Sequence, residues 1–348
     1  MLLKYSEHGL QRFWAGHDSS IYFHSLCSQS FLSDMHDIIG DIHGHADELV
    51  ELLHKLGYSE ESGVFRHPER RMLFCGDFID RGPRIRDTIN IVRNMCESGS
   101  AAAVMGNHEL NALAFHTPHP TKPDEFLRRH TEHNLKQHSA TLKQLDASDL
   151  ESALNWFRTL PVSLDLGSLR VVHACWDDRD LKTLSDASTQ FGHMSPEFLL
   201  HATQTGNTVL RAVERSMKGP EMKLPEGSYL IDREGARRER TRIRWYDPPE
   251  KHTLASYSWP AIDDPALAAL PVPPSVRPAV YPPSNPPVFI GHYWLFAESP
   301  APLAVNVACL DYSVAKYGML TAYRHQGEKI LRPDRFVTVP SRARGVLN

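Results

Sequence analysis

The stretch HDIIGDIHG at residues 36–44 decides the fold that this sequence predicts. A short apolar run ends at a glycine, and a carboxylate and an imidazole follow it directly. Apolar side chains then recur at helical spacing up to Gly57, at Ala46, Leu49, Val50, Leu53 and Leu56. The order predicts a strand, a loop that carries polar functional groups, and a helix.

The same unit recurs twice along the chain. The apolar residues 72–75 precede GDFIDRG at residues 76–82, and residues 101–105 precede GNHE at residues 106–109. Such a βαβαβα series predicts a sheet with parallel character that is covered by helices. In sheets of this kind functional groups gather at the carboxyl ends of the strands. All three polar motifs fall at such ends.

Further strands are expected at residues 169–173, 288–291, 304–310 and 319–323. His173 and His292 each follow an apolar run, which places both imidazoles at the same rim of the sheet. The predicted domain comprises residues 35–348 and contains a long insertion at residues 178–287. Residues 1–34 show no clear periodicity and are expected to be a peripheral extension, because a first strand directly after Met35 needs nothing before it.

Bulk composition excludes some classes of function. The net charge of −4 gives no global basic field that would attract nucleic acid or an anionic membrane. No run approaches the roughly 18 apolar residues of a membrane helix. The five cysteines lack zinc-site spacing and are expected to be reduced, which predicts a cytoplasmic protein.

The polar motifs contain ligands for metal ions. Asp41 and His43 stand two residues apart at a strand end, so both side chains can turn toward one point. Asp77 can bridge two cations with its two oxygens, and Asn107 adds a neutral carbonyl ligand. With the two rim histidines, these residue types predict two divalent transition metal ions, manganese first and iron or zinc as alternatives.

Two metal ions about 3.5–4 Å apart would clamp an in-line phosphoryl displacement and make hydroxide from water near neutral pH. Attack by that metal-bound hydroxide requires no Ser, Cys or Lys nucleophile. The leaving oxygen needs a proton, and His108 is the expected donor, oriented by the carboxylate of Asp80. Arg81 supplies a fork that matches phosphate oxygens. The chain is therefore predicted to be a metal-dependent phosphoesterase.

These fragments resemble the calcineurin-like metallophosphoesterases, and more narrowly their phosphoprotein-phosphatase branch with its bacterial diadenosine tetraphosphate hydrolases. The resemblance covers residues 36–177 and 288–325. It implies a mixed α/β fold with a central β-sandwich flanked by helices. It also implies that Asp41 and His43 bind one metal ion, that Asp77 bridges, and that the second ion is bound by Asn107, His173 and His292.

The chain departs from that family at two places. Residues 291–294 read GHYW instead of Gly-His-x-His, so a further histidine ligand of many broader members is absent, which favours the phosphatase branch. The insertion does not align with eukaryotic Ser/Thr phosphatases, whose second phosphate-binding arginine therefore has no assigned counterpart. Arg242 and Arg244, beside Trp245 and Tyr246, are candidates to bind a phosphate and stack on a base. The alternative is a solvated hairpin of mixed charge.

The substrate stays open between a phosphoprotein and a small phosphorylated or nucleotide compound. A dinucleoside polyphosphate would need a basic pocket lined by aromatic rings, and the acidic net charge disfavours a nucleic-acid end. A different class of function is a non-catalytic, metal-bound interaction protein. The loss of a ligand would indicate that class, and no ligand of the expected set is missing.

Overall fold

The computed structural model describes residues 35–231, 237–262 and 264–342. The extension expected over residues 1–34 lies outside these described residues. A short two-stranded sheet joins the first helical unit to the next strand, formed by β2 (Ser59–Glu61) and β3 (Val64–Arg66).

The first main sheet holds the three strands predicted from the repeated motifs. In it β1 (Met35–Ile39) pairs in parallel with β4 (Arg71–Phe74), which pairs in parallel with β5 (Ala101–Ala103). The other edge of β1 is covered by antiparallel strands from the end of the chain, β15 (Asp311–Tyr312), β16 (Met319–Gln326) and β17 (Phe336–Pro340). The parallel character expected from the sequence is confirmed for β1, β4 and β5.

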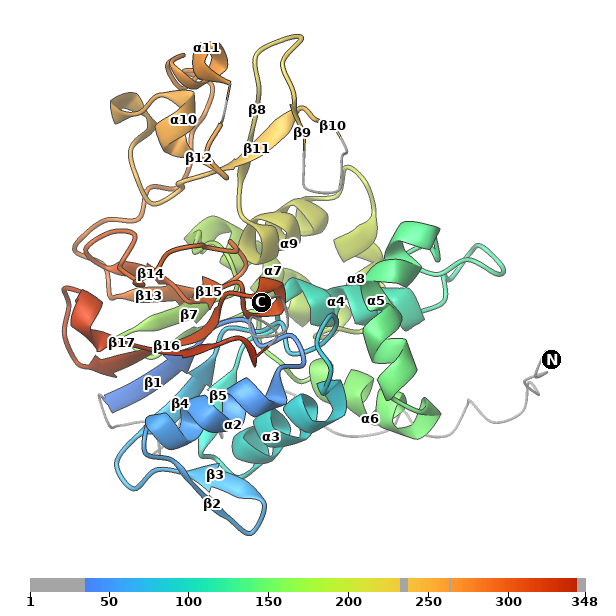
Figure 1. Cartoon of the computed structure of the whole chain (residues 1–348). Helices are drawn as coiled ribbons and strands as arrows, with labels where there is room; N and C mark the ends of the chain where they lie inside the picture. The colour runs from blue at the N-terminus through green and yellow to red at the C-terminus, as the bar shows by residue number, and fades with distance from the viewer. Residues whose placement is uncertain (1–34, 232–236, 263, 343–348) are drawn as a thin grey trace. The chain divides into compact units, whose positions relative to one another are not determined.

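A second sheet has the order β14 (Val307–Cys309), β13 (Val288–Ile290), β7 (Arg170–Val172) and β6 (Ser163–Asp165). Its strand β13 runs parallel to both β14 and β7. The two sheets face each other, because the ring of Phe289 on β13 lies 5.1 Å from that of Tyr323 and 5.9 Å from that of His325 on β16. The predicted β-sandwich is confirmed (Figure 1).

Helices cover the outer face of the first sheet. The amphipathic helices α2 (Ala46–Lys55) and α3 (Ile85–Glu97) pack side by side there and bury the apolar positions that the sequence placed on one stripe (Figure 1). Helix α4 (Asn107–His116) follows β5, and α5 (Glu132–Gln144) and α6 (Ala147–Phe157) complete this layer. The chain between α4 and β6 thus contains a loop followed by the helices α5 and α6.

The residues predicted as an insertion divide into two parts. Helices α7 (Asp178–Phe191), α8 (Pro196–Thr203) and α9 (Thr208–Lys218) contribute side chains to the main hydrophobic core, among them Leu184, Phe198 and Val213. The rest belongs to a second core cluster that contains Trp245, Tyr257 and Tyr281.

This second part is built from short elements. They are β8 (Glu221–Lys223), β9 (Leu230–Ile231), β10 (Arg237–Arg238), β11 (Arg240–Ile243), η1 (Pro249–Lys251), α10 (Leu254–Tyr257), β12 (Ser258–Trp259) and α11 (Pro265–Ala268). Two further 3-10 turns, η2 (Val314–Lys316) and η3 (Pro333–Arg335), flank β16. Among the described residues, no helix is long and apolar enough to cross a membrane.

Candidate active site

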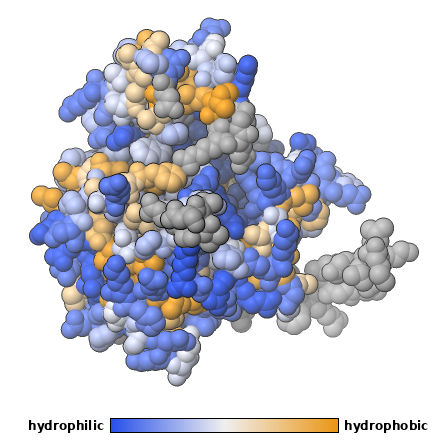
Figure 2. All heavy atoms as spheres, viewed as in Figure 1, coloured by the Kyte–Doolittle hydropathy of each residue, from blue (hydrophilic) through white to orange (hydrophobic). Residues whose placement is uncertain are grey.

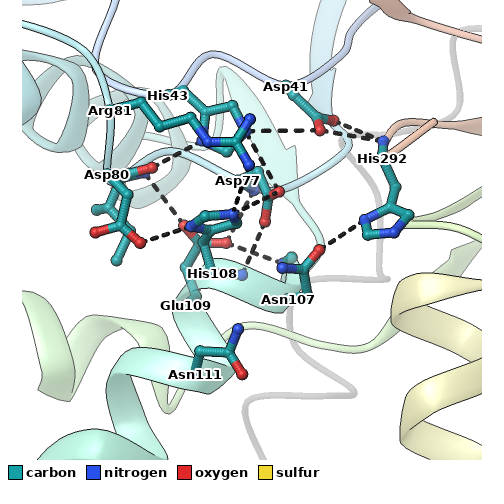
Figure 3. A network of polar contacts seen from close by, with 12 residues as sticks. Asp41, His43, Asp77, Asp80, Arg81, Asn107, His108, Glu109, Asn111 and His292 are labelled. Carbon is teal, nitrogen blue, oxygen red and sulfur yellow. Dashed lines mark hydrogen bonds and ion pairs between the residues drawn. The ribbon is translucent and has the colours of Figure 1, made fainter. Parts of the chain in front are cut away.

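The polar motifs meet where the strands of both sheets end. Asp41 follows β1, Asp77 follows β4 and Asn107 opens α4 directly after β5. From the second sheet, His173 follows β7 and His292 follows β13. The structure therefore brings the predicted ligands of five separate chain segments into one buried cluster (Figure 3), as expected for the carboxyl ends of parallel strands.

The carboxylate of Asp77 lies at the centre of this cluster. Its Oδ2 atom is 3.4 Å from His173 Nε2, 3.6 Å from His43 Nε2 and 3.9 Å from His108 Nε2. Its Oδ1 atom accepts a hydrogen bond from the backbone N–H of His108. One oxygen of Asp77 is thus fixed by the backbone and the other faces three imidazoles, which is the position of a bridging ligand.

Backbone carbonyl groups orient two of the imidazoles. His43 Nδ1 lies 2.9 Å from the oxygen of Ile79, and His173 Nδ1 lies 2.7 Å from that of Cys75. A ring nitrogen that donates to a carbonyl leaves the other nitrogen with its lone pair free, which is the arrangement of metal-binding histidines. The Nε2 atoms of both rings consequently point toward Asp77.

The second side of the cluster is formed around Asn107. Its Oδ1 atom lies 3.1 Å from His173 Nε2 and 2.7 Å from His292 Nδ1. The backbone N–H of His292 donates to both oxygens of Asp41, at 3.2 and 3.1 Å. These contacts place all six predicted ligand residues in one continuous network.

Several buried atoms in this network have no hydrogen-bond partner, namely His43 Nε2, Asp77 Oδ2 and His292 Nε2. Orphaned buried polar atoms are costly, and a ligating role is one way to satisfy them. Two groups that share Asp77 have the spacing of a metal site. One contains His173 and His292, and the other contains His43 together with His108, the predicted proton donor. The residues present therefore fit a pair of divalent cations.

The buried carboxylates of the cluster also favour the binding of cations. Burial raises the pKa of Asp41 well above its usual value, and the neighbouring carboxylate of Asp311 raises it further. Burial would also raise the pKa of Asp77, but attraction to His173 and His108 outweighs burial and holds that pKa well below its usual range. Bound positive charge would keep all three buried carboxylates ionised together.

Glycines make the close approach of these loops possible. A Cβ atom on Gly106 would collide with Oδ1 of Asp77, and one on Gly291 would collide with Oδ1 of Asp41. Non-glycine residues of the site adopt left-handed backbone conformations, with φ of 47° at His43, 58° at Asp77 and 71° at His292. Such conformations are strained and gather at functional sites.

His108 stands beside the cluster with the partners expected for a proton donor. Its Nδ1 atom lies 2.6 Å from Asp80 Oδ2, and its Nε2 atom lies 3.3 Å from Nη2 of Arg81 (Figure 3). The guanidinium of Arg81 stacks on the indole of Trp294, with its Cζ atom 4.4 Å from the ring centroid. The predicted trio of His108, Asp80 and Arg81 is therefore adjacent to the ligand cluster.

Sequence reasoning missed a second histidine on Asp80. His138 of α5 is buried and its Nδ1 atom lies 2.8 Å from Asp80 Oδ1, which also accepts a hydrogen bond from Thr141 Oγ1 at 2.6 Å. Burial would raise the pKa of Asp80, but hydrogen bonds with His108 and His138 outweigh it and hold that pKa below its usual range. His138 belongs to a histidine-rich stretch whose other members are half-buried or exposed, so composition could not single it out.

Glu109, the last residue of the GNHE motif, lies in the first turn of α4. The structure shows its carboxylate fully buried, where it accepts backbone N–H groups of Asp77 at 2.9 Å, Phe78 at 2.8 Å and Gly106 at 3.0 Å. It thereby ties the loop after β4 to the start of α4. Its helix position was the only signal available from sequence.

The two candidate substrate arginines lie on or directly after β11. The Arg242 side chain donates from Nε to the backbone oxygen of Lys218 at 2.7 Å, and its charge helps to lower the pKa of His292, after the larger effect of burial. Arg244 lies over the ring of Trp259, at 5.5 Å from the centroid. Trp245 and Tyr246 are only 0% and 6% exposed, and the stacking of a base beside these two arginines stays a prediction.

Comparison with known proteins gives a consistent result. The model of the calcineurin-like phosphoesterase family matches residues 37–210, which is half of the chain. The asymmetrical bis(5'-nucleosyl)-tetraphosphatase PrpE of Bacillus subtilis (strain 168) is 32% identical over 180 residues, covering 50% of this chain and 68% of that protein. The corresponding protein of Bacillus velezensis is also 32% identical, and the match covers 66% of its length.

A likeness to solved structures is weaker. A protein serine/threonine phosphatase from Saccharomyces cerevisiae has a TM-score of 0.45 and 11% identity, with 92% of this chain and 88% of that chain covered.

The family match includes the loops after β1, β4 and β5 and the segment that contains His173. The chain belongs to the calcineurin-like phosphoesterase family.

Proposed function

We propose that the protein hydrolyses phosphoric esters or anhydrides at a site that holds two divalent cations. The observation that carries this proposal is the position of Asp77 Oδ2, a buried atom without a hydrogen-bond partner that lies 3.4–3.9 Å from three imidazole nitrogens. Asp41 and His43 would hold one cation and Asn107, His173 and His292 the other, with Asp77 shared. Manganese is the first candidate, and iron and zinc suit the same donor set.

When bound, a pair of divalent cations polarises the phosphoryl group and supplies hydroxide near neutral pH. The protein residues then have two remaining tasks. The guanidinium of Arg81 would donate two parallel hydrogen bonds to phosphoryl oxygens and so orient the phosphoryl group. His108, aligned by Asp80, would give a proton to the leaving oxygen as the bond to phosphorus breaks.

For the substrate we favour a nucleotide that contains a phosphoanhydride over a phosphoprotein. The relatives named bis(5'-nucleosyl)-tetraphosphatases support this preference. A hollow beside the site also supports it, since the guanidinium of Arg244 lies there among the rings of Tyr246, Trp259 and Tyr293. Tyr293 directly follows His292, so this apolar hollow adjoins the ligand cluster. A half-buried ring such as Trp259 could meet a base there.

The reaction class is tested with two variants and one generic substrate. Asp77→Asn removes the shared carboxylate charge and His108→Asn removes the proton donor. Both should lower the turnover of 4-nitrophenyl phosphate with manganese by roughly 10²-fold or more. Glu151→Gln, on the exposed surface of α6, is a matched control that should keep wild-type turnover. Unchanged turnover in both site variants would refute the mechanism.

A screen that includes diadenosine tetraphosphate and phosphopeptides separates the two substrate classes. A higher kcat/KM for the dinucleotide supports the preferred class, and a higher value for a phosphopeptide contradicts it. A cytoplasmic location remains part of the proposal, because the four cysteines in the described part of the chain are free thiols.

A further inference from the structure

A second positive side chain, Arg128, lies close to the proposed proton donor and has no role in the reaction described so far. It stands in a hollow whose wall also contains Asp80 and His108, together with Asn111 and Gln137. The hollow has a volume of about 230 Å³, including the space at its open mouth. Most of its lining side chains are polar or charged, so it suits a phosphate group better than a nucleoside.

The guanidinium of Arg128 is held in place without being neutralised. Its Nη1 atom donates to Asn111 Oδ1 and its Nη2 atom to Gln137 Oε1, both at 2.8 Å. Both acceptors are neutral amides, and Arg128 makes no ion pair with any described residue. The nearby carboxylate of Asp80 is already bonded to His108, His138 and Thr141. The guanidinium therefore keeps its full charge and further N–H donors for a ligand.

The backbone that carries Arg128 is fixed against α4. The N–H of Arg128 donates to the oxygen of Ala114 at 3.0 Å, and that of Leu127 donates to the oxygen of Thr117 at 2.9 Å. Two residues on, the ring of His130 is stacked between Phe115 and Phe126, at centroid distances of 3.8 and 4.2 Å. A charged group on such a fixed support is preorganised, so less conformational entropy is lost when it binds an anion.

Arg128 lies on the same side of the site as His108. Asn111 follows His108 by three residues on α4, so the two side chains lie on the same side of the helix (Figure 3). Asn111 accepts a hydrogen bond from Arg128. The hollow thus adjoins the residue proposed to protonate the leaving oxygen. The surface around α4, α5 and α8 is mainly hydrophilic, which is consistent with a charged ligand entering there (Figure 2).

We propose that Arg128 binds a phosphate of the leaving group and makes the enzyme selective for phosphoanhydrides over simple phosphate esters. The inference rests on the proposed function and adds a residue that selects its substrate class. In hydrolysis of an anhydride, a new bond forms from the hydroxide oxygen to phosphorus and the bond from phosphorus to the bridging oxygen breaks. The electron pair of that bond goes to the bridging oxygen of a leaving group that already carries charged phosphates. An alcohol or phenol leaving group offers no such charge to Arg128.

The test compares Arg128→Gln with Arg129→Gln, which removes the same charge from the next, exposed residue. For each protein, kcat/KM is measured with diadenosine tetraphosphate and with 4-nitrophenyl phosphate in excess manganese. Arg128→Gln should lower the ratio of the two values roughly 10- to 100-fold, the range expected for a lost hydrogen bond to a charged group. Arg129→Gln should leave the ratio at the wild-type value, and Arg128→Lys should lie between.

Inhibition gives a second readout that needs no turnover of a dinucleotide. Inorganic tripolyphosphate and orthophosphate are used as inhibitors of 4-nitrophenyl phosphate hydrolysis. Arg128→Gln should raise the inhibition constant of tripolyphosphate roughly tenfold and change that of orthophosphate much less. An unchanged tripolyphosphate constant together with an unchanged selectivity ratio overturns the role of Arg128. An equal loss toward both substrates, with both inhibitors weakened alike, overturns it as well.

The outcomes also separate this inference from the proposed function. If the wild-type protein hydrolyses neither substrate with manganese, the proposed function fails and the inference fails with it. If the wild type is active and only the Arg128 comparisons are negative, the inference alone fails. A wild type that hydrolyses the aryl ester and is not inhibited by tripolyphosphate likewise overturns the leaving-group site.

Discussion

At the scale of single residues, Glu109 decides whether the ligand loops hold their positions. Its buried carboxylate is the common acceptor for N–H groups at the start of the Asp77 loop and at Gly106. These loops have left-handed residues, so their backbone N–H groups cannot be satisfied by regular sheet or helix bonds. Burial, and then the charge of Asp77, raise the pKa of Glu109 to about 7. Above that pH its carboxylate only accepts hydrogen bonds, whereas an amide would also donate.

We expect Glu109→Gln to weaken both stability and activity. The amide NH₂ would face backbone donors, leaving at least one buried N–H unsatisfied, at a cost of about 1–3 kcal/mol in the free energy of unfolding. Urea denaturation at about pH 8.5, above the raised pKa of Glu109, measures the change. Turnover of 4-nitrophenyl phosphate should fall by roughly tenfold or more as the Asp77 loop shifts. Wild-type values in both assays would show that Glu109 does not position the loop.

At the scale of elements, a partly buried ion pair joins two helices that the sequence pattern placed in an insertion. Asp177, which caps α7 by accepting the N–H of Arg179, also receives Nη2 of Arg215 from α9 at 2.7 Å. Burial would raise the pKa of Asp177, but hydrogen bonds from Arg179 outweigh it and lower that pKa. Arg179 belongs to α7 itself and is largely exposed, so the link between the two helices is the pair with Arg215, whose guanidinium also contacts Asp180.

The substitution Asp177→Asn isolates the charge, because Asn caps a helix as well as Asp does. We expect a loss of about 1–3 kcal/mol in the free energy of unfolding at pH 7. The folded pKa is lowered, so this stabilisation is fully present above the unfolded value of about 3.9 and is lost as pH falls below it. Urea denaturation at pH 7 and near pH 3.5 should show the difference between the two proteins shrinking.

Asp186→Asn, in the exposed pair with Lys182 on the same helix, is the matched control and should change stability by less than about 0.5 kcal/mol at either pH. An Asp177→Asn effect that stays constant between the two pH values, or that grows toward acid, would contradict the assignment of this pair.

At the scale of the whole molecule, local sequence patterns predicted the individual strands, loops and ligand residues. The contacts between distant segments became visible only in the folded structure. The strand ends and the glycine-containing loops were sufficient to predict the six metal-ligand residues, because the carboxyl ends of parallel strands lie at the same edge of a sheet. The bond from His138 to Asp80 could not be foreseen, since it joins residues 58 positions apart on separate elements. Likewise, the burial of Trp245 depends on a second core assembled from distant segments, and no periodicity in residues 242–246 signals it.

The central claim is that Asp77 is shared by two cations, and anomalous diffraction from crystals grown with manganese tests it most directly. We predict two anomalous peaks about 3.5–4 Å apart on either side of Asp77. One should lie next to His43 and the other next to His173, and both should weaken or vanish in crystals of Asp77→Asn. A single peak, peaks away from Asp77, or two full peaks in the Asp77→Asn protein would contradict the claim.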